Sequence, residues 1–106
     1  MAKYMLEVNY TLDGVRGLLA EGGTAREAAA RAATESLGGT MDSFLFAFGG
    51  TDVYVVADLP DHASAAALAL TVSAGGGATT KTVVLLTTAE LDAAAAKRVG
   101  YRPPGS

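Results

Sequence analysis

The segment Ser43–Phe48, with the sequence SFLFAF, is the feature that most restricts how this chain can fold. Alternate side chains of an extended strand point to opposite faces, so its three phenylalanines would share one face and a leucine and an alanine the other. A strand that is apolar on both faces is usually covered on both faces. The sequence therefore predicts a sheet with a layer on each side.

Four strands are predicted from runs in which apolar and polar residues alternate or β-branched residues dominate. They cover Lys3–Thr11, Thr40–Phe48, Asp52–Leu59 and Ala78–Thr87. Short hairpin loops need residues with positive φ, which glycine adopts without strain. We therefore expect Gly49-Gly50-Thr51 to form a tight hairpin between the second and third strands.

Helices are predicted wherever apolar residues or alanines recur at helical spacing. They cover Thr11–Leu19, an alanine-rich run from Thr24 to Gly38-Gly39, His62–Ala74, and a short run from Thr87 to Arg98. Capping boxes are expected at Thr24 with Glu27 and at Thr87 with Glu90, and an N-cap is expected at Asp61. On the second helix the predicted inner face consists of Ala25, Ala29, Ala32 and Ala33.

The order βαββαβ with a terminal helix predicts an α+β, ferredoxin-like domain over residues 1–99, followed by a tail at 100–106. Its four-stranded antiparallel sheet would carry both long helices on one face and leave the other open. The chain has no further layer, so we expect a second copy to cover the open face and form a homodimeric α/β barrel, or a higher oligomer. The expected interface residues are Phe44, Phe46 and Phe48.

Charge and composition exclude several classes of function. The net charge of −3 argues against a nucleic-acid partner, which would need a basic patch. No apolar run is long enough to cross a bilayer, and the N-terminus enters a strand pattern directly, so we expect a cytoplasmic protein without a membrane partner. With no cysteine and one histidine, neither a metal site nor a cofactor is expected.

Four features together resemble one known family. These are the strand pattern, the Glu-Gly-Gly-x-x-Arg junction at Glu21–Arg26, the phrase SFLFAFGGTDVYVVADLPD and the ending YRPPG. Over essentially its whole length the chain resembles the GYD-domain family, small bacterial proteins assigned to the dimeric α/β-barrel superfamily. The Gly-Tyr-Asp that names the family appears here as Gly50-Thr51-Asp52, so the tyrosine is missing.

This resemblance implies a fold and leaves the activity open, because the family has no settled biochemical function. Relatives by superfamily include cofactor-free monooxygenases, isomerases, lyases acting on small aromatic molecules, and haem-handling proteins. Such breadth means that function has to be argued from the residues of this chain.

The predicted open face places Asn9, Asp52 and Tyr54 near the mouth of the barrel. Asp52 has two interpretations: it caps a turn by accepting backbone N–H bonds, or it acts as a base or hydrogen-bond acceptor for a ligand. Glu7 and Asp58 also point to this face. Each would either carry out proton transfer with a raised pKa or pair with a basic residue such as Lys81 or Arg102.

His62, the only histidine, lies at the predicted start of a helix. It is either exposed to solvent or, alternatively, a general base or axial haem ligand that reaches the open face. The helix dipole disfavours a protonated histidine at this end.

Two classes of function follow from these residues. In the first, the protein binds a small molecule or serves as an oligomeric scaffold, without catalysis. In the second, it is a cofactor-independent monooxygenase or isomerase acting on a small aromatic or carbonyl compound. The candidate catalytic residues are then Asp52, Tyr54 and His62, with Asn9, Asp52 and Tyr54 as ligand-binding residues.

Overall fold

The computed structural model describes residues 1–106 and contains four strands and four helices. In chain order they are β1 (Ala2–Tyr10), α1 (Leu12–Glu21), α2 (Gly23–Ser36), β2 (Thr40–Phe46), β3 (Val53–Leu59), α3 (His62–Ala74), β4 (Ala78–Leu85) and α4 (Thr88–Ala96). The sheet has the order β2-β3-β1-β4, and every neighbouring pair is antiparallel. The predicted ferredoxin-like α+β fold is confirmed.

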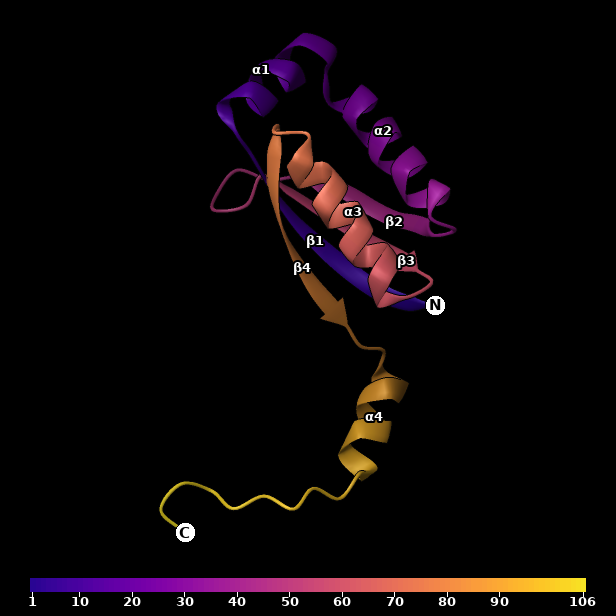
Figure 1. Ribbon diagram of the computed structural model, residues 1–106, viewed down its shortest axis with the longest axis vertical. Helices are drawn as coiled ribbons and strands as arrows, with labels where there is room; N and C mark the ends of the chain where they lie inside the picture. The colour runs from indigo at the N-terminus through magenta and orange to yellow at the C-terminus, as the bar shows by residue number, and fades with distance from the viewer.

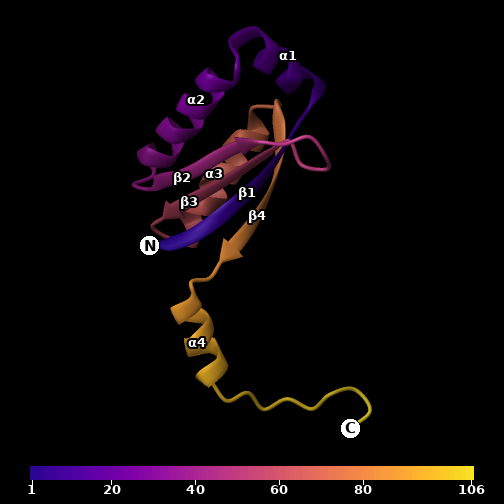
Figure 2. The same cartoon turned by 180° about the vertical axis from the view of Figure 1, so that it is seen from behind.

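One face of the sheet is covered by α2 and α3, and the other has no covering layer (Figures 1 and 2). The core lies between these helices and the two central strands. Tyr4 and Leu6 of β1 are 1% and 3% exposed, and Val53 and Leu59 of β3 are fully buried. The alternation in β1 and β3 therefore predicted correctly which side chains face the helices.

The phenylalanines of β2 lie on the helix-covered side, which corrects their expected placement on the open face. Phe44 pairs in register with Val55 and Phe46 with Val53, two residues that are buried under the helices. Phe48 follows the end of β2 and is fully exposed. A register irregularity between Met41 and Ser43 changes which side chains of β2 face the helices. The open face instead receives Ser43 and Leu45 from this strand.

The connection between β2 and β3 is longer than the predicted tight hairpin, because the strands end at Phe46 and begin again at Val53. Neither Gly49 nor Gly50 has a positive φ. The backbone N–H of Asp52 donates to the carbonyl of Val8 on β1 (3.0 Å), so this residue is tied to β1. The expectation of a tight, positive-φ turn was therefore wrong.

The predicted helix starts were right for α3 and α4. Asp61 caps α3 by accepting from the backbone N–H of Ser64 (2.7 Å), and hydrogen bonds with Ser64 lower the pKa of Asp61. Thr87 and Glu90 form the predicted capping box of α4.

The start and inner face of α2 differ from the prediction. Gly22, with φ of 87°, turns the chain so that α2 begins at Gly23 without a side-chain cap. Thr24 therefore lies inside the first turn and forms no capping box. The residues of α2 that face the core are Ala30, Ala33 and Thr34, whereas Ala25 and Ala32 are exposed.

Candidate functional site

A small apolar cavity lies between α2, α3 and the sheet. We call it the inner chamber, and its volume is about 130 Å³. Its walls are almost entirely apolar and include Leu6, Val8, Ala30, Phe44, Val55 and Leu68. The space exists because α2 turns small alanine side chains toward the sheet while α3 lies over β3 and β4. Such a cavity favours an apolar occupant.

A second, more polar hollow opens next to the inner chamber, at the end of the sheet where β1 finishes. We call it the outer chamber, and its volume is about 370 Å³. Its lining includes Gly14, Leu18, Glu21, Thr71 and Gly77. Backbone and carboxylate oxygens therefore border it, in contrast to the walls of the inner chamber.

Tyr10 and Arg26 line both chambers and stand at the boundary between them. Burial raises the pKa of Tyr10, although the guanidinium of Arg26 opposes this effect. The phenol is therefore protonated at neutral pH and has a hydrogen to donate. Arg26 itself is held by Glu21, whose Oε1 accepts from Nη1 at 2.9 Å across the turn at Gly22.

The polar boundary of the two chambers was missed by sequence reasoning. No functional role was assigned to Tyr10 from the sequence, and Arg26 was named only as part of the Glu-Gly-Gly-x-x-Arg junction. The useful signal was the spacing from Glu21 to Arg26 around two glycines. In the structure this spacing lets the two charged side chains meet directly after the last turn of α1.

The start of α1 lies in close backbone contact with the turn between α3 and β4, beside the outer chamber. Thr11 donates from its backbone N–H to the carbonyl of Gly77 (3.0 Å) and from its hydroxyl to the carbonyl of Gly76 (2.8 Å). A Cβ added at Gly14 would lie 1.8 Å from the carbonyl oxygen of Gly77. Only glycine at position 14 permits this approach of α1 to the α3–β4 turn.

Asn9 and Asp52, two of the predicted ligand-binding residues, contact each other. The backbone N–H of Asp52 donates to Oδ1 of Asn9 (3.1 Å), and Oδ2 of Asp52 accepts from the backbone N–H of Tyr10 (2.8 Å). Both side chains thus connect the β2–β3 loop to β1. Asp52 accepts a backbone N–H bond and stabilises a loop, in agreement with the first of its two interpretations. Asp52 also borders a shallow hollow of about 460 Å³ beside Phe46 and Tyr10.

Tyr54 and His62, the other two candidates, lie apart from the chambers. Tyr54 is on the open face, paired in register with Glu7 of β1 and Leu45 of β2. The Nδ1 atom of His62 lies 2.6 Å from the hydroxyl of Tyr4 near the start of α3. The structure therefore does not bring the three candidate catalytic residues together.

His62 has a structural role that a substitution can test. Tyr4 is 1% exposed, so its hydroxyl would lose its hydrogen-bond partner in the variant His62→Leu. We expect a loss of about 1–3 kcal/mol in the free energy of unfolding, measured by urea denaturation. The double variant Tyr4→Phe/His62→Leu should lose less than the sum of the two single variants, by about 1 kcal/mol. If the losses of the two single variants simply add up in the double variant, Tyr4 and His62 do not interact.

One charged residue of the open face has a partner that was not predicted. Asp58 pairs with Lys3 (3.2 Å), which also contacts Asp42, and hydrogen bonds with these two carboxylates raise the pKa of Lys3. Lys81, one of the expected partners, lies opposite Glu7 in the register of β1 and β4. Since Lys3 neutralises part of this negative charge, a covering layer would bury fewer unpaired charges.

No three His, Cys, Asp or Glu side chains lie close enough together to hold a metal ion. No helix combines the length and the apolar character needed to cross a bilayer.

Residues 4–95 match the GYD domain, which is most of the 106-residue chain. No match was found among curated proteins or among solved structures.

Proposed function

The chain belongs to the GYD domain family, and we propose that it is a homo-oligomeric protein that binds a small, uncharged, mainly aromatic molecule without catalysis. The observation that carries the proposal is the position of Tyr10 and Arg26 between an apolar and a polar chamber. A ligand with an apolar ring and one hydroxyl or carbonyl group would meet matching surroundings at both ends.

The size and the charges of the site narrow the class of ligand. The inner chamber, at about 130 Å³, is close to the volume of an engineered apolar cavity of about 150 Å³ that binds benzene. At its polar end Arg26 is already paired with Glu21, and the negative charge of Asp52 also acts on Tyr10. An anionic ligand would therefore find little free positive charge, whereas a neutral acceptor can receive the hydrogen of Tyr10.

The positions of the candidate catalytic residues favour binding over catalysis. A cofactor-independent monooxygenase or isomerase needs a base within hydrogen-bond reach of its substrate. Asp52 holds a loop, Tyr54 lies on the open face and His62 contacts Tyr4, so none of them lines the inner or the outer chamber.

The exposed area of the chain supports assembly with further copies. A self-contained folded monomer of this mass exposes about 5,500 Å², whereas this chain of 10.7 kDa exposes 6940 Å². The excess area, to which the exposed residues 86–106 also contribute, is larger than the roughly 800 Å² that each partner buries in a standard interface. Leu45 and Tyr54 on the open face are 65% and 37% exposed, and a second sheet packed on this face would cover them.

Filling the inner chamber should block binding. Ala30 lines the chamber and Ala28 is exposed on the same helix, so Ala30→Leu and Ala28→Leu form a matched pair. We expect saturable binding of 2-naphthol to the wild type, measured by its fluorescence. Affinity should fall at least about tenfold, or 1.4 kcal/mol, in Ala30→Leu and stay unchanged in Ala28→Leu.

Two outcomes of this titration would contradict the proposal: no saturable binding to the wild type, or equal affinities of the two variants. The anion 2-naphthoate, which has the same rings with a carboxylate, is the control for the charge of the ligand. This anion should bind more weakly than 2-naphthol. Tighter binding of the anion would mean that Arg26 exchanges Glu21 for the ligand and would overturn the uncharged class.

A further inference from the structure

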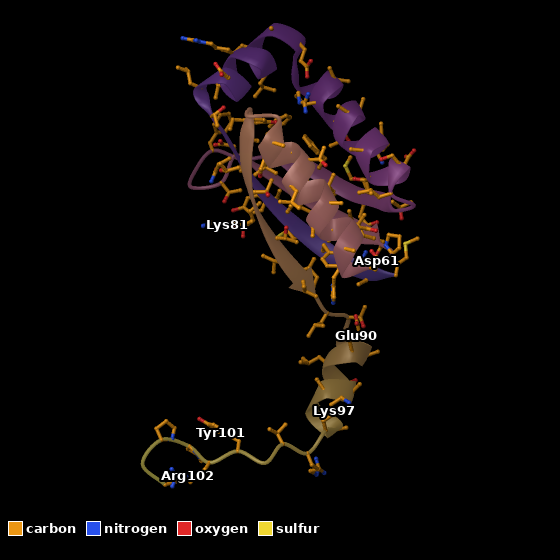
Figure 3. All side chains as sticks on the ribbon, viewed as in Figure 1. Asp61, Lys81, Glu90, Lys97, Tyr101 and Arg102 are labelled. Atoms are coloured by element: carbon orange, nitrogen blue, oxygen red, sulfur yellow. The ribbon has the colours of Figure 1, made fainter.

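The last part of the chain stands away from the rest of the molecule (Figures 1 and 2). We call residues 86–106 the C-terminal arm; it contains α4 and the segment that follows. All of its residues are exposed. Leu86, Leu91, Val99 and Tyr101 are between 59% and 81% exposed. Figure 3 shows Lys97, Tyr101 and Arg102 far from the sheet.

An arm of this kind is not a stable structure by itself. Isolated helices shorter than about 12–15 residues are marginal in water even when rich in alanine, and α4 has 9 residues. Its capping box supplies hydrogen bonds only at the first turn. The helix and the apolar side chains around it therefore need a surface against which to pack.

The overall shape indicates that the surface against which the arm packs lies outside this chain. The radius of gyration is 16.8 Å, whereas a compact domain of this length has about 13 Å. The arm continues from β4, an edge strand of the sheet. When two sheets pack face to face, each edge strand lies beside an edge strand of the other sheet. In such a packing the segment that follows β4 would begin beside the second copy.

Charge is also complementary between the arm and the rest of the chain. Residues 1–85 contain nine acidic and five basic residues, whereas the arm contains two acidic residues, Glu90 and Asp92, and three basic residues that all lie in its last ten positions. The basic residues are Lys97, Arg98 and Arg102. The last ten residues of the arm are therefore attracted to the acidic body of another copy.

We propose that the C-terminal arm of each subunit packs against a second copy of this chain and holds the dimer together. This inference rests on the proposed assembly through the open face. It adds a specific surface to that assembly, because Leu91 and Tyr101 would be buried between subunits. The attraction of Lys97 and Arg98 for the acidic partner should weaken with added salt.

Truncation tests the arm directly. A chain that ends at Thr87 keeps every core residue, and we expect its dimer dissociation constant to rise on the order of 100-fold, measured by sedimentation velocity against the full chain. Leu91→Ser should weaken the full-length dimer in the same direction. Ala93→Ser, on another side of α4, is the matched control and should leave the constant unchanged.

The two proposals fail in different ways in this experiment. A full-length chain that stays monomeric would overturn the assembly itself, and the arm contact with it. Equal dissociation constants for the full and truncated chains would leave the dimer in place and overturn only the role of the arm.

Trypsin distinguishes the second copy from the chain's own body as the docking surface. Lys97 and Arg98 are exposed in the single chain and lie within the arm. We expect slow cleavage after them at concentrations above the dimer dissociation constant and rapid cleavage after dilution below it. Protection that does not change with concentration would place the arm on its own chain, and rapid cleavage at every concentration would show an unpacked arm. Either result would overturn the inference.

Discussion

Replacing Gly14 by alanine is expected to lower the free energy of unfolding by at least about 3 kcal/mol. The added Cβ would lie 1.8 Å from the carbonyl oxygen of Gly77 and 2.8 Å from its carbonyl carbon. These are backbone atoms, so no side chain can rotate out of the way. Helix α1 would have to separate from the α3–β4 turn and break the hydrogen bond from Thr11 to Gly77.

Gly17 provides the matched control for this substitution. It lies in the same helix, and a Cβ added there would meet nothing within 4 Å. Gly17→Ala should therefore stabilise the protein by about 0.5–1 kcal/mol, because glycine is a poor helix former. Urea unfolding of both variants measures the two effects. A Gly14→Ala variant as stable as the wild type would mean that α1 and the turn are not in contact.

Replacing Leu45 by aspartate is expected to convert the oligomer into monomers. Leu45 lies on the open face beside Tyr54 and is 65% exposed in the single chain. A carboxylate there costs the isolated chain little, but a covering sheet would bury it without a partner. We expect the dimer dissociation constant to rise by a factor on the order of 1,000 or more.

Leu70 is the control for the effect of charge alone. It is 70% exposed on α3, which lies on the other side of the sheet. Leu70→Asp should therefore keep the subunit count of the wild type in sedimentation velocity. An unchanged oligomer for Leu45→Asp would contradict burial of the open face between subunits, provided that circular dichroism shows both variants folded.

The overall architecture was predictable because the relevant signals are local. Alternation in β1 and β3 identifies the side chains that face the helices, and Tyr4 and Leu59 are indeed buried. Pro60 and Asp61 mark the start of α3, whose bounds agree with the prediction. Alternation and helix caps act within a few residues, so they can be recognised without knowledge of the tertiary contacts.

The same rules could not predict which face of β2 meets the helices. Both faces of SFLFAF are apolar, so alternation alone does not say which face meets the helices. The irregularity between Met41 and Ser43 decides the question, and it depends on pairing with β3. The start of α2 also depends on geometry, because Gly22 turns the chain directly from one helix into the next.

The candidate site lay largely outside the reach of sequence reasoning. Tyr10 and Arg26 belong to different elements, and the Gly14–Gly77 contact joins positions far apart in the chain. Asp52 was identified from its place next to a loop, and the structure shows it accepting a backbone hydrogen bond from Tyr10. What a side chain near a turn contacts is decided by the fold, so its chemical role could be stated only after the chambers were located.

The most direct test of the account is native mass spectrometry of the full chain purified from its own host. The central claim is that a second copy covers the open face of the sheet, so we predict a species with an even number of chains at micromolar concentration. A constant extra mass on that species would give the mass of a bound small molecule. A monomer at the same concentration would contradict the account, because the exposed face and the arm would then have no partner.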